Sequence, residues 1–201
     1  MNSIKNIKSN SVCTNILIVG VGGQGTILTS RILGEMLLNC GCDIKISEIH
    51  GMSQRGGSVA TQVRFGEKVY SPIIRPGTAD ILLAFEPLEA LRYAKWLKAD
   101  GIAIVNDRRV IPMPVVIGAA KYPDNIAETL SRIAGETVFF DALAYACEAG
   151  NAKSVNVVLL GVLSRYLGIE EAVWVDAIKK VVAAAYLEAN LKAFAMGRAY
   201  K

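Results

Sequence analysis

The chain has 201 residues, 52% of them hydrophobic, which is enough to build one ample core in a single domain. Its formal net charge of +4 is too small for the dense Lys/Arg stripe of a nucleic-acid-binding protein, and no apolar run reaches the roughly 18 residues that span a bilayer. The composition therefore predicts partners other than nucleic acid or membrane, and the mild positive charge favours an anionic ligand or an acidic partner surface.

The start of the chain and the cysteines indicate where the protein works. Residues 1–14 are polar and lack the apolar stretch of a signal peptide, so we predict a flexible tail at 1–14 and a single α/β domain at 15–201. The cysteines at 13, 40, 42 and 147 have spacings from which neither a zinc site nor an iron–sulfur site can be assembled. Scattered thiols of this kind suit the reducing cytoplasm, so we predict a cytoplasmic protein with no metal of its own.

A glycine-rich loop follows the first predicted strand, residues 16–20. It reads Gly20-Val21-Gly22-Gly23-Gln24-Gly25 and opens into a helix predicted from Gln24 to Cys40, which Gly41 ends. A strand, a glycine turn and a helix N-terminus in this order form an anion cradle, because unpaired amides and the helix dipole point at one spot. The alternative is that these glycines only permit tight packing of the helix on the strand.

A second glycine-rich loop follows the next predicted strand, residues 43–48, and reads Glu48-Ile49-His50-Gly51-Met52-Ser53-Gln54-Arg55-Gly56-Gly57-Ser58. Bare glycines let a ligand or a partner backbone approach closely, and the Arg55 guanidinium can clamp a carboxylate or phosphate with two parallel hydrogen bonds. His50 is the only histidine, and it is either a hydrogen-bonded structural residue or a catalytic group that titrates near neutrality. In a parallel sheet both loops emerge at one edge, where such folds bind ligands.

The remaining segments alternate between strands and helices. Ser58–Phe65 has the alternation of a strand, and Gly66-Glu67 is expected to turn it toward Val69–Ser71 as a β-hairpin insert. Further strands are predicted at 79–85, 102–106, 115–117 (a short edge strand) and 137–141, and helices from Pro87 to about Lys98, from Asn125, over 156–167 and over 170–194. The pattern predicts an α/β fold: a doubly wound, mostly parallel sheet with a β-hairpin insert and a helical C-terminal third.

The candidate site has no complete catalytic set. No serine or cysteine has an evident base partner besides His50, and no His and carboxylate cluster indicates a catalytic metal, so His50 and Arg55 are the only catalytic candidates. Turns beside strand ends, such as Asp107-Arg108-Arg109, are expected to be solvated. Asn156 is expected to cap its helix, to bond a loop carbonyl or to contact a ligand. The candidate cofactor-binding residues are Gly20, Gly22, Gly23, Gln24, Gly25, Glu48, Ser53, Gln54, Arg55, Gly56, Gly57 and Asn156.

These motifs resemble the gamma-type catalytic domain of the 2-oxoacid:ferredoxin oxidoreductases. The resemblance rests on the two glycine loops and on the segment Asn156-Val157-Val158-Leu159-Leu160-Gly161. Within that family, the combination of His50-Gly51-Met52 with Gln54-Arg55-Gly56-Gly57 is most similar to the beta subunits of the indolepyruvate:ferredoxin oxidoreductases. The match runs from Asn15 to the helices beyond Gly168, and the second loop is its most specific element.

The resemblance implies a small subunit in the oxidative decarboxylation of an aryl 2-oxoacid with coenzyme A and ferredoxin, which gives an acyl-CoA and carbon dioxide. It also implies that a larger partner subunit holds the thiamine diphosphate and the iron–sulfur clusters. This chain would then supply binding surface and orientation, and it would be inactive alone.

Two other functions are compatible with the residues. A free-standing NAD(P)- or flavin-dependent oxidoreductase would use the first loop with an acid about 20 residues onward, and Glu48 follows Gly25 by 23 residues. A non-catalytic anion-binding interaction module would use the same loops without redox chemistry. The residues themselves do not separate indolepyruvate from pyruvate or 2-oxoglutarate, so the aryl substrate rests on the resemblance.

Overall fold

One mixed sheet of six strands organises the computed structural model, which describes residues 13–50 (backbone alone at His50) and 56–200. The strand order is β2-β3-β1-β4-β5-β6, with β1 (Thr14–Val21), β2 (Asp43–His50), β3 (Ser58–Gly66), β4 (Ala79–Ala84), β5 (Leu97–Asn106) and β6 (Glu136–Phe140). β1, β4, β5 and β6 are parallel neighbours in that order, whereas β3 runs antiparallel to both β1 and β2.

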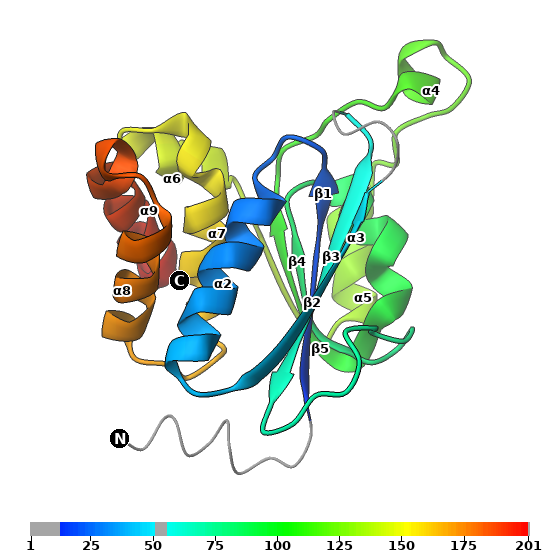
Figure 1. Ribbon diagram of the computed structural model, residues 1–201. Coiled ribbons are helices and arrows are strands. Elements are labelled where there is room, and N and C mark those ends of the chain that lie inside the picture. Colours follow the sequence, from blue (N-terminus) through cyan, green and yellow to red (C-terminus); the bar gives the residue numbers. More distant parts are fainter. Residues whose placement is uncertain (1–12, 51–55, 201) are drawn as a thin grey trace.

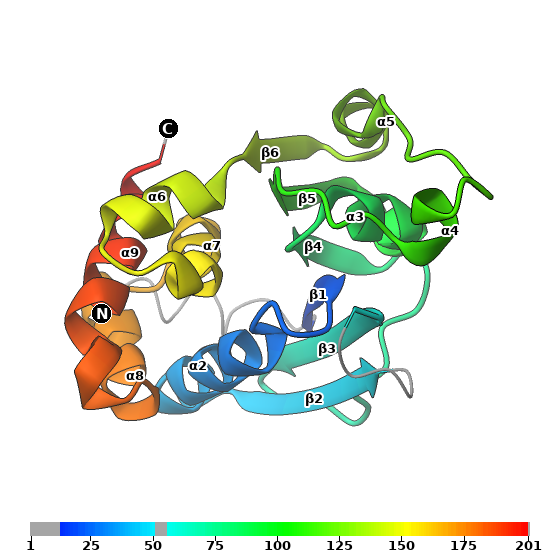
Figure 2. The same ribbon diagram turned by 90° about the horizontal axis from the view of Figure 1, so that it is seen from above.

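Helices cover both faces of the sheet, which confirms the predicted doubly wound α/β fold with a helical C-terminal third (Figures 1 and 2). One face carries α2 (Thr26–Asn39), α6 (Ala142–Glu148), α7 (Val155–Ser164), α8 (Glu171–Val181) and α9 (Leu187–Ala199), and the other carries α3 (Pro87–Tyr93) and α5 (Ile126–Ile133). Each face has its own hydrophobic cluster, and the larger one lies beneath the C-terminal helices.

The hairpin insert lies elsewhere than predicted. β2 and β3 form the hairpin, and Val69–Ser71 is not a strand. The reason is that β3 uses both of its edges, pairing with β1 from Ser58 to Phe65 and with β2 from Val59 to Gly66. No free edge is left for residues 69–71, and the Val69 N–H donates instead to Asp43 Oδ2 at 2.9 Å.

Several boundaries also differ from the prediction. Residues 170–194 form two helices instead of one, because α8 ends at Val181 and a 3-10 turn (Ala184–Tyr186) precedes α9. The helix from Pro87 ends at Tyr93 and is followed by a 3-10 turn (Ala94–Trp96), because β5 already begins at Leu97, where it pairs with Ala79. Residues 115–117 are not an edge strand. They belong to a short helix, α4 (Met113–Val116), in which a proline in the first turn suits a helix start. The predicted tail falls outside the described residues apart from Cys13 and Thr14, and Thr14 is the first residue of β1.

Helix α7 lies at the centre of the C-terminal layer. Every residue from Asn156 to Ser164 is buried, as expected for a helix that is apolar on all sides. Its neighbour α9 approaches so closely that a Cβ on Gly161 would lie 2.3 Å from the Phe194 carbonyl oxygen, and a Cβ on Gly197 would lie 2.1 Å from that of Val158. The two helices therefore touch backbone to backbone, and this contact fixes where α7 begins.

Candidate functional site

The two glycine loops meet at the carboxyl edge of the sheet, as the sequence predicted. The Gly22 N–H donates to the Gly57 carbonyl at 2.8 Å, and the Gly56 N–H donates to the Gly22 carbonyl at 3.3 Å. These bonds continue the pairing of Val21 with Ser58, the last pair between β1 and β3. The start of β3 thus holds the first loop in place.

The side chain of Gln24 fixes the conformation of the first loop through two hydrogen bonds. Its Oε1 accepts a hydrogen bond from the Val21 N–H at 2.7 Å, and its Nε2 donates to the Phe85 carbonyl at 3.3 Å. A Cβ on Gly20 would lie 2.8 Å from that Oε1, so this fold of the side chain requires glycine there. Gln24 therefore ties the end of β1 to the end of β4 and fixes the path of the loop.

Gly25 begins helix α2 in a left-handed conformation, with φ of 91°. That conformation favours glycine, and a glycine also leaves the helix start without a capping side chain. A Cβ on Gly25 would lie 3.4 Å from Cγ and Nδ2 of Asn156, so the loop approaches the start of α7 closely. The helix N-termini of α2 and α7 therefore lie beside the same space.

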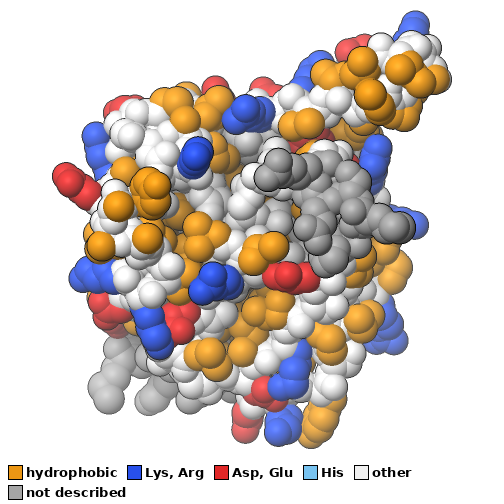
Figure 3. All heavy atoms as spheres, turned by 45° about the horizontal axis from the view of Figure 1, so that its top comes forward, with side chains coloured by type: hydrophobic (Ala, Val, Ile, Leu, Met, Phe, Trp, Pro, Cys, Tyr) orange, Lys and Arg blue, Asp and Glu red, His pale blue; other side chains and the backbone are white. Residues whose placement is uncertain are grey.

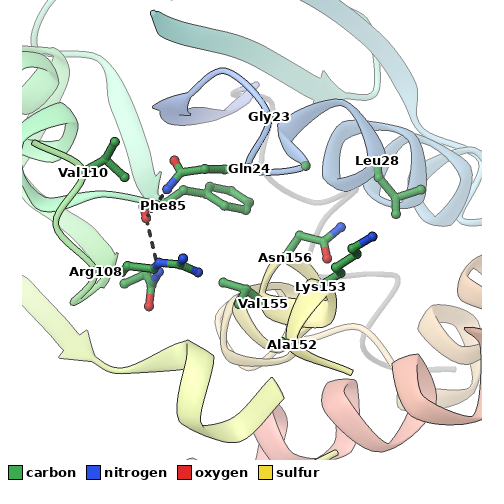
Figure 4. Close-up of a pocket in the computed structure, with 12 residues that line it drawn as sticks. Gly23, Gln24, Leu28, Phe85, Arg108, Val110, Ala152, Lys153, Val155 and Asn156 are labelled. Atoms are coloured by element: carbon green, nitrogen blue, oxygen red, sulfur yellow. Dashed lines mark hydrogen bonds between the residues drawn. The ribbon is translucent and has the colours of Figure 1, made fainter. Parts of the chain in front are cut away.

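A pocket of about 440 Å³ occupies that space (Figure 4). The described residues that line it come from the ends of β1, β4 and β5 and from the starts of α2 and α7: Gly23, Gln24, Gly25, Leu28, Phe85, Asn106, Arg108, Val110, Ala152, Lys153, Val155 and Asn156. The helix after β1 covers one face of the sheet and the helix after β4 covers the other. The pocket thus sits at a topological switch point, where open α/β sheets bind ligands.

The electrostatics of the pocket favour an anion. Arg108 and Lys153 contribute two cationic side chains, and none of the described lining residues is acidic. Neither α2 nor α7 has a side-chain cap or an acidic residue in its first turn. The uncapped first turn of α2 and the positive ends of both helix dipoles therefore add to the two side-chain charges; α7 itself follows a 3-10 turn (Ala152–Ser154) whose Lys153 N–H donates to Asn151 Oδ1.

Asn156, at the start of α7, has a buried side-chain amide with an unpartnered oxygen. Its side chain is only 3% exposed, and its Oδ1 has no hydrogen-bond partner. A buried polar atom without a partner costs about 1–3 kcal/mol, so the few that occur call for an explanation. Figure 4 shows the Asn156 side chain at the pocket wall, beside Lys153 and across from Arg108. Asn156 therefore lines the pocket with its side chain, while its amide oxygen is enclosed by protein.

The opposite wall is braced by Asn106, at the end of β5. Its Nδ2 donates to the Phe85 carbonyl at 3.2 Å, and its Oδ1 accepts from the Ala142 N–H at 2.9 Å. This 1% exposed amide joins β4, β5 and the start of α6. It positions Phe85 and the chain that leads to Arg108.

The structure brings together only some of the predicted site residues. Gly23, Gln24, Gly25 and Asn156 line the pocket, while Gly20, Gly22, Gly56 and Gly57 shape or hold the first loop. Glu48 does not line this pocket; it lines a smaller hollow of about 200 Å³ together with Gly22 and Gly23 of the first loop, and its Oε1 accepts from Ser30 Oγ of α2 at 3.2 Å. Ser53, Gln54 and Arg55 lie outside the described residues, as does the side chain of His50.

Eight of the twelve described lining positions were not predicted as site residues, among them four with polar or aromatic side chains. Arg108 was expected in a solvated turn and is indeed exposed, but it also lines the pocket, and Lys153, Asn106 and Phe85 were not singled out at all. Two of them had a usable signal, because Phe85 and Asn106 stand at the carboxyl ends of predicted strands, where ligand-binding residues gather. Lys153 had none, since only the docking of α7 brings it near the loop.

Neither a metal site nor a membrane span is found among the described residues. No three His, Cys, Asp or Glu side chains there gather closely enough to hold a metal ion. Within the same residues, no helix has both the length and the apolar character needed to cross a bilayer.

Fold and pocket together define an α/β domain with a cation-lined pocket at a switch point of its sheet. The model of the family "pyruvate ferredoxin/flavodoxin oxidoreductase" matches residues 15–200, and the chain belongs to that family. It is 42% identical over 188 residues to the indolepyruvate oxidoreductase subunit IorB of Thermococcus kodakarensis, covering 91% of this chain and 93% of that one. The predicted resemblance to the small subunits of the indolepyruvate branch is thus confirmed.

Two solved structures share the fold. The gamma subunit of a keto/oxoacid ferredoxin oxidoreductase from Geobacter sulfurreducens superimposes with a TM-score of 0.67 and 25% identity, covering 92% of this chain and 95% of that one. The 2-oxoglutarate:ferredoxin oxidoreductase of Magnetococcus marinus has a TM-score of 0.71 and 23% identity, covering 93% of this chain but 30% of that one. In the latter protein, the same fold forms part of a much longer polypeptide.

Proposed function

We propose that the chain is the small subunit of a thiamine-dependent 2-oxoacid:ferredoxin oxidoreductase that converts indolepyruvate or another aryl 2-oxoacid, with coenzyme A, to an acyl-CoA and carbon dioxide. The names of its relatives support the substrate class. The reaction needs a larger partner subunit that holds thiamine diphosphate and iron–sulfur clusters and passes electrons to ferredoxin. When bound there, thiamine diphosphate supplies the carbanion chemistry of decarboxylation.

This chain's own role in the reaction would be to hold coenzyme A, and the observation that supports this role is the pocket between α2 and α7. The phosphates of coenzyme A match two helix N-termini flanked by Arg108 and Lys153, and the pocket volume of about 440 Å³ is in the range of small-molecule sites. Leu28, Phe85 and Val155 add an apolar wall for the uncharged part of the ligand. The Magnetococcus enzyme was solved with 2-oxoglutarate, coenzyme A and succinyl-CoA bound.

The topology does not favour a free-standing nicotinamide or flavin enzyme. A dinucleotide site needs the acid at the end of a strand adjacent to the glycine-loop strand. Here β3 lies between β1 and β2, and Glu48 pairs with Thr61, which in turn pairs with Ile18. The backbone of Glu48 is therefore two strands away from β1, about 10 Å across the sheet at the usual strand spacing, and its carboxylate reaches the hollow beside Gly22 and Gly23 with one oxygen already engaged by Ser30.

The decisive measurement uses the reconstituted complex with its large subunit. Arg108→Ala and Lys153→Ala should each raise the KM for coenzyme A about tenfold or more, because hydrogen bonds to charged groups contribute about 1.5–3 kcal/mol. The KM for the 2-oxoacid should stay within about twofold of the wild-type value. Arg75→Ala is the matched control, because Arg75 is an exposed arginine near the start of β4, at the opposite edge of the sheet.

Pantetheine provides a second control, because it carries the reactive thiol of coenzyme A without the phosphates. The Arg108 and Lys153 variants should leave the KM for pantetheine unchanged. An unchanged KM for coenzyme A in both variants would show that the pocket does not bind its phosphates.

A further inference from the structure

An arm, residues 107–124, leaves the carboxyl end of β5 and returns to the start of α5. Figure 1 shows that its tip, residues 111–120, projects beyond the rest of the domain and carries α4. The tip has no charged residue. Its large hydrophobic side chains are open to solvent: Ile111 is 48% exposed, Met113 70%, Val116 63% and Ile117 71%.

These side chains form a patch, whereas single exposed hydrophobic residues are normal on any surface. Hydrophobic side chains gather over the projecting segment in Figure 3. No residue of α4 is buried, so the tip contributes nothing to the core of the domain. A contiguous apolar surface that does not stabilise its own domain marks an interaction site.

The arm is held at its two roots by one carboxylate, Glu86, which is fully buried. Glu86 Oε1 accepts hydrogen bonds from the Tyr122 hydroxyl at 2.5 Å and from the Val110 N–H at 3.2 Å. The Tyr122 hydroxyl in turn accepts from the Leu88 N–H at 3.2 Å, and the Arg109 guanidinium lies 5.1 Å from the centre of the Tyr122 ring. Residues on both sides of the tip are therefore tied to one point on the domain.

The tip also has its own backbone structure. The Ile117 N–H donates to the Met113 carbonyl at 3.0 Å, and the Ala120 N–H donates to the Pro114 carbonyl at 3.0 Å. Pro112 and Pro114 restrict the backbone further, since each fixes its own φ. A segment ordered in advance loses little conformational entropy when it binds, so more of its contact energy is available for affinity.

We infer that the arm docks into an apolar socket with an acidic rim on the thiamine-containing large subunit. This inference rests on the proposed function. The uncharged tip calls for an apolar socket, and the nearest charges on its two sides, Arg109 and Lys121, call for acidic groups at the rim. Arg108 and Val110, at the first root, line the candidate coenzyme pocket, so the arm continues the surface that faces the partner's active site.

A second copy of this chain is a weaker candidate for the socket. The chain has a net charge of +4, so self-association would bring the cationic flanks of the tip against a basic protein. An acidic partner surface avoids that repulsion.

The test measures binding of the full-length chain to the large subunit, with wild-type and variant chains side by side. Met113→Asp/Ile117→Asp should weaken the affinity about 100-fold or more, as expected when two central apolar anchors are charged. Leu38→Asp/Tyr70→Asp is the matched control, because Leu38 is 58% exposed and Tyr70 88% exposed, away from the arm. The control should bind within about threefold of wild type. Both double variants should unfold at the wild-type temperature, because only exposed side chains change.

The possible results separate the two proposals. If the wild-type chain forms no complex with the large subunit, the proposed function is wrong. If wild type forms the complex and Met113→Asp/Ile117→Asp binds equally well, the docking role of the arm is refuted. A wild-type dimer that this variant converts to monomers, with no change in binding to the large subunit, would refute it as well. Slowed hydrogen exchange of the amides of residues 111–120 on complex formation would support it directly.

Discussion

Replacing Gly161 by alanine tests whether α7 and α9 are held backbone to backbone. The new methyl group would lie 2.3 Å from the Phe194 carbonyl oxygen and 2.8 Å from the Arg198 backbone nitrogen, and neither obstacle is a side chain that can rotate away. The helices must move apart, which costs about 1–3 kcal/mol or more for an overpacked core. Alanine recovers about 1 kcal/mol through its helix propensity.

We expect the separation of α9 from the fully buried α7 to lie at the upper end of that range or above it, which leaves a net loss of about 2–3 kcal/mol. For a chain of this size, that loss lowers the Tm by about 4–12 °C in a thermal unfolding experiment. Gly197→Ala should behave alike, because its Cβ would lie 2.1 Å from the Val158 carbonyl oxygen. The two losses should not add in the double variant, since one separation of the helices relieves both clashes.

Gly34→Ala in α2 is the matched control. Its methyl group would lie 3.3 Å from Cδ1 of Ile46, the end of a side chain that is 39% exposed and free to shift. This variant should keep the wild-type Tm or raise it by a few degrees, because the gain in helix propensity has little to oppose it. If Gly161→Ala unfolds at the wild-type temperature, the close contact between α7 and α9 does not exist.

Two further predictions concern the pocket and the second loop. Asn156→Ala should change the Tm by no more than about 2 °C, because Oδ1 has no hydrogen-bond partner to lose. The same variant should raise the KM for coenzyme A about tenfold in the reconstituted complex. A large fall in Tm with an unchanged KM would make Asn156 a structural residue. Burial raises the pKa of Glu89, whose carboxylate accepts from Ser58 Oγ at 2.5 Å, so its ionisation should destabilise the fold as the pH rises above 4.5, the ordinary value for glutamate. Glu89→Gln should therefore gain Tm over wild type as the pH rises above 4.5, and the gain should level off once Glu89 is ionised in the folded state; a difference independent of pH would contradict this reasoning.

Local patterns in the sequence were sufficient to predict the sheet, the first glycine loop and its helix. The run from Ile16 to Gly20, the glycines and the helix up to Gly41 carry their signals within a few residues. The position of β3 could not be predicted in this way, because the pairing of Ser58 with Val21 is a contact between distant segments. A period-two pattern shows that a strand exists but not which neighbour it chooses.

Only part of the site could be predicted, because its remaining residues are brought together by contacts between distant segments. Gly23 and Gly25 belong to a motif, whereas Arg108 and Lys153 reach the pocket through the path of the chain after β5 and through the docking of α7. Charged residues in turns are usually solvated, so nothing local distinguished Arg108 from Arg109. Residues 115–117 of the arm were mispredicted as an edge strand because apolar, β-branched residues beside prolines favour that interpretation when no exposed helix is expected.

The two walls of the pocket are made at different times during synthesis. A ribosome that has released residues up to Gly150 has made the whole sheet and both glycine loops, but Lys153 and Asn156 have not yet been made. The helix that carries them is then locked in place by α9, which ends at Ala199. A chain that ended before α9 would contain every strand and the whole phosphate-type motif, but it would lack the close backbone contact that holds α7 and its pocket-lining residues in place. Capture of an anionic ligand would therefore report that α9 has been made and has docked on α7.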